Sequence, residues 1–161
     1  MIVVSDASPV NLLVRIGYVD VLPMLFESVI MPPAVASELS HSSMPEVVRT
    51  WMAEHHVWLT IRAPLKIDPT LELEDPGEVE AISLALELKA DLLLADDRKA
   101  RRVASQHGLV ITGSVGVLEL ASARNLLSLQ DAFNKVRQTD FRVAEHILQQ
   151  ALDREFDRRA K

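Results

Sequence analysis

The feature of this sequence that most limits its fold is a set of short apolar segments that stop abruptly at acidic residues. Ile2 to Val4 is followed by Ser5-Asp6, and Leu92 to Ala95 is followed by Asp96-Asp97. A strand that is apolar at every position has both faces buried, as the strands of a helix-covered parallel sheet do. These segments therefore predict strands in the interior of an α/β fold.

Helical patterns separate the apolar segments. Ser8 is expected to cap a helix in which Pro9 takes the first position, and Asp75 and Pro76 give the same signals for a later helix. Glu78 completes a capping box there. Further strands are expected over 28–31, 57–61 and 109–111, and further helices over 34–39, 46–55, 98–107 and 117–124. This alternation predicts a three-layer α/β/α sandwich with a central, mainly parallel sheet.

Length and composition fit one globular domain. The chain has 161 residues, of which 48% are hydrophobic and 25% charged, as in ordinary globular proteins. The only irregular stretch, 62–73 with Pro64 and Pro69, is too short to separate two domains. We therefore expect a single domain over 1–161, with a core of about residues 1–127 followed by C-terminal helices over 128–161.

Nothing in the sequence predicts export or membrane insertion. The first residues carry no positive charge before the apolar run and reach Asp6 at once, unlike a signal peptide. The apolar runs are far below the ~20 residues that a membrane helix needs. The chain has no cysteine, which excludes disulfides, thiolate zinc sites and cysteine nucleophiles. We expect a cytoplasmic protein without membrane contact.

Acidic residues fall where ligands bind in a parallel sheet, outside the carboxyl ends of its strands. Asp6 and Asp96-Asp97 follow strands, and Glu38 and Glu78 lie on helices that can reach the same edge. Several carboxylates in one cleft repel one another, and a divalent cation is the usual means of holding them ionised. A set of oxygen ligands without cysteine favours Mg²⁺ or Mn²⁺ over zinc.

The net charge of −6 argues at first against a nucleic-acid binder. Setting aside these five acids, however, leaves 18 of the 23 acidic residues against 17 basic ones. A metal ion can activate water for attack on a phosphodiester, and a second ion can stabilise the leaving oxygen. The candidates for binding the phosphate backbone of a nucleic acid lie directly after the acidic pair and are Arg98, Lys99, Arg101 and Arg102.

Five segments, in order, carry a family resemblance: VVSDASP at 3–9, PAVASEL at 33–39, DPGEVEAI at 75–82, ADLLLADDR at 90–98 and TGSVGVL at 112–118. Together they resemble the PIN-domain nucleases, and most closely the PIN-like toxins of the VapC type from prokaryotic toxin-antitoxin pairs. The resemblance covers most of the chain, roughly residues 3–127. No single segment is diagnostic, but the ordered set is fairly specific.

The resemblance implies a PIN-like fold and an Mg²⁺- or Mn²⁺-dependent ribonuclease that forms homodimers and is silenced by a cognate antitoxin protein. The implied catalytic and metal-binding acids are Asp6, Glu38, Glu78 and Asp96 or Asp97. Ser8 and Ser114 would contact these acids or a phosphate. The family often has serine or threonine, a variable residue and then aspartate after the late strand, whereas this chain has Ala95-Asp96-Asp97.

Two other functions stay open at this point. A catalytically silent PIN-like binding module is compatible with Ala95 at the position where the family commonly has a hydroxyl. A phosphoacceptor receiver domain also places acids and Mg²⁺ at strand ends, but its paired acids follow the first strand, whereas this chain has its pair late. Each acid also has a structural explanation: Asp6, Glu78 and one of the Asp96-Asp97 pair can cap a helix or lie in its first turn. Glu38 can be a solvated glutamate on a helix.

Overall fold

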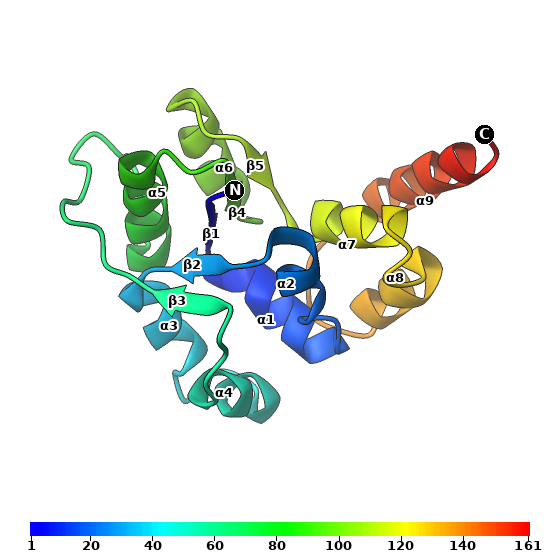
Figure 1. Ribbon diagram of the computed structural model, residues 1–161, viewed down its shortest axis with the longest axis horizontal. Coiled ribbons are helices and arrows are strands. Elements are labelled where there is room, and N and C mark those ends of the chain that lie inside the picture. The colour runs from blue at the N-terminus through cyan, green and yellow to red at the C-terminus, as the bar shows by residue number, and fades with distance from the viewer.

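A computed structural model describes all 161 residues, which form nine helices and one five-stranded sheet (Figure 1). The strands are β1 (Val3–Ser5), β2 (Val29–Met31), β3 (Leu59–Ile61), β4 (Leu92–Leu94) and β5 (Ile111–Thr112). The helices are α1 (Ala7–Ile16), α2 (Val21–Phe26), α3 (Pro33–Leu39), α4 (Glu46–Ala53), α5 (Pro76–Leu88), α6 (Arg98–Gln106), α7 (Ser114–Ala123), α8 (Leu129–Arg137) and α9 (Glu145–Arg159). All neighbouring strands run parallel.

Each face of the sheet carries its own layer of helices. Val3 and Leu94 belong to the larger buried cluster, which includes side chains of α1, α2 and α7. Val4 and Leu93 belong to a smaller cluster with side chains of α5 and α6. Because successive side chains of a strand point to opposite faces, strands that are apolar throughout fill both layers. The predicted three-layer α/β/α sandwich is confirmed.

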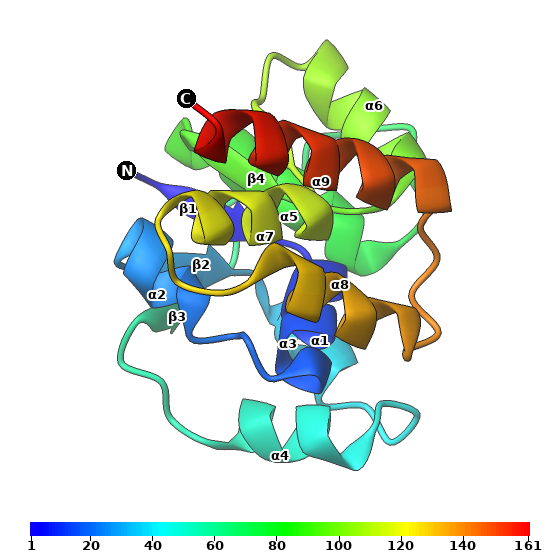
Figure 2. The ribbon, with the colours of Figure 1, turned by 90° about the vertical axis from the view of Figure 1, so that its right-hand side faces the viewer.

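The C-terminal helices lie on one flank of the molecule. Figure 2 shows α7, α8 and α9 stacked on the side that faces the viewer. Phe133 of α8 and Leu148 and Ala151 of α9 are buried in the larger cluster. The helical segment predicted after residue 127 therefore packs into the same core as the sheet. No helix of the chain combines the length and the apolar character that crossing a bilayer requires.

Helices α3 and α5 come from distant parts of the chain but pack against each other (Figure 1). The Ala34 N–H at the start of α3 donates a hydrogen bond of 3.2 Å to Oε1 of Glu80 on α5. Val35 and Leu39 on the inner face of α3 are fully buried. This packing brings Glu38 of α3 towards the first turn of α5.

The strand order β3-β2-β1-β4-β5 places the first strand in the middle of the sheet. Strands β2 and β3 lie on one side of β1, and the later strands β4 and β5 lie on its other side. The Asp6 N–H donates to the Leu94 carbonyl at 2.9 Å, which joins the carboxyl ends of β1 and β4. Open parallel sheets bind ligands at this kind of reversal point.

Three local predictions need correction. Helix α1 begins at Ala7 with Asp6 as its N-cap, so Ser8 is not the cap. Asp75 caps α5 as predicted, but the Glu78 carboxylate does not bond back to the Asp75 N–H, so only half of the capping box forms. The last strand is Ile111–Thr112, and α7 begins at Ser114, earlier than predicted, because the extended backbone of Gly113 serves as the N-cap.

The other predicted elements lie within two residues of their expected bounds. Helix α2 was not predicted, since its six residues are too few to show a helical period and Pro23 interrupts the pattern.

Candidate metal centre

Asp6 lies at the carboxyl end of the central strand and is only 7% exposed. Its Oδ1 accepts the Ala7 N–H at 2.8 Å. Burial raises the pKa of Asp6 to about 7 although the Ala7 N–H favours the ionised form, and the negative charges of Glu38, Asp75 and Asp96 act in the same direction as burial. An ionised Asp6 is therefore costly unless a cation is near.

Asp96 follows β4 and is held by three hydrogen bonds. Ser8 donates through Oγ to Oδ2 at 2.8 Å. Ser114 donates through its backbone N–H to Oδ1 at 2.7 Å and through Oγ to Oδ2 at 2.6 Å. The two serines, which come from the starts of α1 and α7, thus fix both oxygens of Asp96. This orientation keeps the carboxylate beside Asp6, whose pKa it helps to raise.

Gly113 makes the approach of α7 to Asp96 possible. A Cβ at this position would lie 2.8 Å from Oδ1 of Asp96 and 2.4 Å from Nη1 of Arg101. The backbone of Gly113 is extended, so its requirement is space and not an unusual φ angle. Glycine here lets the Ser114 N–H reach Asp96 and lets the Arg101 guanidinium lie against the backbone of Gly113.

Asp97 is exposed and caps α6, where its Oδ2 accepts the Ala100 N–H at 3.0 Å. Its charge also raises the pKa of Glu78. The two adjacent aspartates therefore affect different acids: Asp96 raises the pKa of Asp6, and Asp97 raises the pKa of Glu78.

Glu38 on α3 and Glu78 on α5 are partly buried, and neither carboxylate accepts a hydrogen bond from the chain. Burial, followed by the charges of Asp97, Asp6, Asp75 and Glu38, raises the pKa of Glu78 to about 7. Burial and then Asp75 raise the pKa of Glu38. Both glutamates thus keep free lone pairs in a negatively charged environment.

Asp75 is a further acid of this group that the sequence assigned only to helix capping. Its Oδ2 accepts the Glu78 N–H at 2.9 Å, yet its charge also acts on Asp6, Glu38 and Glu78. Gly77 lies beside it, where a Cβ would be 3.2 Å from Oδ2 of Asp75 and 3.6 Å from Oδ1 of Asp6. The Asp75 carboxylate therefore lies tightly against Gly77, whereas Asp6 is at an ordinary contact distance from this position.

The chemistry of this donor set fits a hard divalent cation. The charged neighbours that raise the pKa values of Asp6, Glu38 and Glu78 are all carboxylates, and none of these three forms an ion pair. No three carboxylate or imidazole side chains are arranged to hold one ion between them as they stand. Mg²⁺ is commonly held by one or two carboxylates and several waters, so a pair of these acids suffices.

The basic residues predicted to bind RNA lie on α6. Arg98, Lys99 and Arg102 are exposed and form no ion pair. Arg101 is partly buried, and its Nη1 donates to the Ala95 carbonyl at 3.4 Å. Arg101 therefore lies beside Asp96 around Gly113, while the other three are exposed to solvent.

Comparison with known proteins shows the family and a similar fold. Residues 2–155 match the family DUF3368, described as a PIN domain. The fold is similar to that of a PilT N-terminus domain protein, SSO1118, from the hyperthermophilic archaeon Sulfolobus solfataricus P2, with a TM-score of 0.51 and 20% identity over 76% of this chain and 92% of that one. No curated protein matches. Since the family match spans nearly the whole chain, the protein belongs to the PIN-domain family.

Proposed function

We propose that this protein is an Mg²⁺- or Mn²⁺-dependent endoribonuclease. The observation that carries the proposal is the buried Asp6, without a cationic partner, beside Asp96 at the carboxyl ends of β1 and β4. Glu38 and Glu78 approach from α3 and α5 with carboxylates that accept no hydrogen bond from the chain. PIN domains are commonly metal-dependent nucleases, which agrees with this reading of the acids.

In the proposed reaction, water attacks an RNA phosphodiester in line with the leaving oxygen. A divalent ion held by these acids would lower the pKa of that water and neutralise charge on the phosphate. Asp6 and Asp96 would hold the ion, and Ser8 and Ser114 fix Asp96 for that role. The Glu78 carboxylate accepts no hydrogen bond from the chain, so it is free to act as a further ligand of the ion or to orient the attacking water.

We also propose that the protein is the toxin of a prokaryotic toxin-antitoxin pair and acts as a homodimer. The support is the ordered resemblance of five segments to PIN-like toxins of the VapC type. Production of the chain in a bacterial host should arrest growth, and the Asp6→Asn variant should not. Co-expression of a cognate antitoxin should restore growth; arrest by both chains alike would contradict the toxin role.

The test of nuclease activity uses a pool of end-labelled RNAs with Mg²⁺ or Mn²⁺. The wild-type protein should cleave, and EDTA should stop cleavage. Asp6→Asn and Asp96→Asn should each abolish it, whereas Asp157→Asn, the same change at an exposed position of α9, should have no effect. Cleavage that survives in the Asp6→Asn, Asp96→Asn double variant would show that these acids do not carry the reaction.

A silent binding module is the second candidate, because Ala95 stands where the family commonly has a hydroxyl. Two serine hydroxyls nevertheless reach Asp96, from Ser8 and Ser114, so Asp96 does not lack such donors. Metal binding without cleavage of any RNA in the pool would favour this candidate. The receiver domain is excluded by the family match and by a strand order that differs from the 2-1-3-4-5 order typical of that fold.

A further inference from the structure

A cavity of about 350 Å³ lies directly beside the acids, with Asp96 in its wall. Arg101 of α6 and the Gly113 backbone line it on the sheet side. The segment between α8 and α9 lines it on the other side with Phe141, Arg142 and Val143. Residues more than forty positions apart in the sequence thus meet around one space.

Two arginines of this cavity form no ion pair. The ion pairs of the chain use Arg15, Arg137, Arg154, Arg158 and Arg159, and so leave Arg101 and Arg142 unpaired. Arg154 also lines the cavity, but Glu119 neutralises it through two hydrogen bonds. An unpaired guanidinium is a preferred partner of phosphate, because its parallel N–H groups match two phosphate oxygens.

The cavity also has an apolar wall, which is made of Phe141, Val143 and Ile147 together with Val115. Phe141 and Val143 are partly buried and pack against the main core, so this wall is supported from behind. Aromatic and apolar side chains bind the faces of unstacked bases in proteins that recognise single-stranded nucleic acids.

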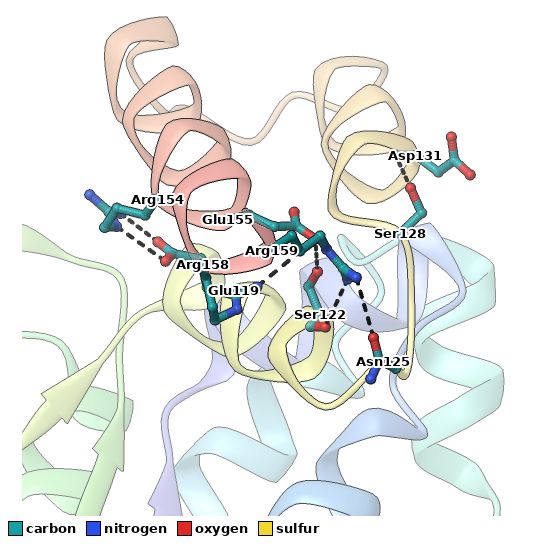
Figure 3. A network of polar contacts seen from close by, with 9 residues as sticks. All are labelled: Glu119, Ser122, Asn125, Ser128, Asp131, Arg154, Glu155, Arg158 and Arg159. Carbon is teal, nitrogen blue, oxygen red and sulfur yellow. Dashed lines mark hydrogen bonds and ion pairs between the residues drawn. The ribbon is translucent and has the colours of Figure 1, made fainter. Parts of the chain in front are cut away.

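Polar contacts hold α7 and α9 together (Figure 3). Glu155 of α9 is buried and accepts hydrogen bonds from Ser122 of α7 and from Arg159. These donors outweigh burial and lower the pKa of Glu155. The Glu119 to Arg154 pair joins the same two helices nearer the cavity. Val115 of α7 and Ile147 of α9, which line the cavity, therefore belong to two helices that are joined to each other.

We propose that this cavity binds one unpaired nucleotide of the substrate RNA, next to the phosphodiester that lies at the acids. Arg101 and Arg142 contact the phosphate of this nucleotide, and its base lies against the wall of Phe141 and Val143. The RNA identity of the ligand rests on the proposed nuclease function. The size of the cavity, at the lower end of small-ligand sites, suits a single nucleotide.

Position and the apolar wall favour a nucleotide over a free anion. Asp96 forms part of both the cavity and the acid group. A phosphate at Arg101 and a phosphate at the acids can therefore be consecutive phosphates of one RNA strand. A lone phosphate ion would leave the apolar wall exposed to water, whereas a base covers it. The consequence is that cleavage requires an unpaired nucleotide beside the cut, and that a duplex is a poor substrate.

The experiment measures binding in EDTA, so that no cleavage occurs, and follows backbone amide signals of the full chain by NMR. The probes are the four ribonucleoside 5′-monophosphates, ribose 5-phosphate and inorganic phosphate. Nucleotides should shift the amide signals of Gly113 and Val143 and should bind more tightly than ribose 5-phosphate. Arg142→Ala should weaken nucleotide binding about tenfold, and Arg142→Lys should weaken it less.

Arg49→Ala is the matched control, since Arg49 is an exposed arginine on α4, far from the cavity (Figure 1). It should leave nucleotide binding unchanged. Absence of nucleotide binding, an equal loss in Arg142→Ala and Arg49→Ala, or equal affinity for nucleotide and inorganic phosphate would each overturn the proposal. Asp6→Asn should not weaken this binding; if that variant still cleaves RNA while Arg142→Ala loses nucleotide binding, the nuclease site is wrong and the cavity assignment stands.

Discussion

Replacing Asp6 by asparagine removes one buried negative charge and keeps the shape of the side chain. Asparagine is as good an N-cap as aspartate, so the hydrogen bond from the Ala7 N–H is preserved. The change therefore isolates the electrostatic cost of Asp6. Its sign follows from the pKa of Asp6, which rises from 3.8 to about 7 on folding.

Below pH 3.8, Asp6 is protonated in both the folded and the unfolded chain and contributes nothing to stability. Between pH 3.8 and about 7 the unfolded chain releases the proton that the folded chain retains, so the free energy of unfolding falls as pH rises. At about 1.4 kcal/mol per pKa unit, the full penalty above pH 7 is at most about 4 kcal/mol.

We expect Asp6→Asn to be more stable than the wild type at pH 8 in EDTA, by about 1 to 4 kcal/mol, and to lose this advantage towards pH 4. Urea unfolding at several pH values measures the difference. Added Mg²⁺ should stabilise the wild type more than the variant, because only the wild type keeps the full set of ligands.

Asp157→Asn is the control for the loss of one charge, since Asp157 is exposed and forms no ion pair. It should change stability by less than about 0.5 kcal/mol at every pH. A variant at Asp6 that is less stable than the wild type at pH 8, or a difference that stays constant from pH 4 to pH 8, would refute the reasoning.

Substitutions at three further positions test the surroundings of Asp96. Gly113→Ala places a Cβ 2.8 Å from Oδ1 of Asp96 and 2.4 Å from Nη1 of Arg101, so it should destabilise the fold by about 1–3 kcal/mol in urea unfolding. Unchanged stability would mean that Gly113 does not pack tightly against Asp96 and Arg101. Ser114→Ala removes one of three hydrogen bonds to Asp96 and should lower the free energy of unfolding by about 1 kcal/mol. It should also weaken Mn²⁺ binding about tenfold in a calorimetric titration, and an unchanged Mn²⁺ affinity would show that Ser114 does not support the metal site. Asp97→Ala should lower the free energy of unfolding by about 1 kcal/mol because it removes the N-cap of α6, whereas Asp97→Asn should keep the cap and the stability. Equal losses of stability in the two variants, measured by thermal or urea unfolding, would contradict the capping role.

The sheet could be predicted from the sequence because its strands signal burial on both faces. Leu92, Leu93 and Leu94 are apolar at every position, and Val3 and Leu94 pack on the opposite side of the sheet from Val4 and Leu93. A run of this kind fits a helix-covered parallel sheet and few other structures. Helix boundaries were less predictable, because Asp6 and Ser8 are both good N-caps and only the tertiary position of Asp96 decides between them.

The acids could be predicted individually, because Asp6 and Asp96 each follow a strand. Their neighbours could not, because these depend on which elements pack together. Asp75 joins the group only because α5 lies against α3, and that packing has no local signature. Arg142 lines a cavity at Asp96 through the placement of the segment between α8 and α9, which no sequence pattern near either residue reveals.

The central claim is that the carboxylates at the ends of β1 and β4 hold a divalent cation. A crystal soaked in Mn²⁺ tests this most directly, because the ion is located by its anomalous scattering. The account predicts a peak about 2 Å from a carboxylate oxygen of Asp6, with Asp96, Glu38 or Glu78 as a further ligand or linked through water. Mn²⁺ bound elsewhere on the protein, with no peak at Asp6, would contradict it.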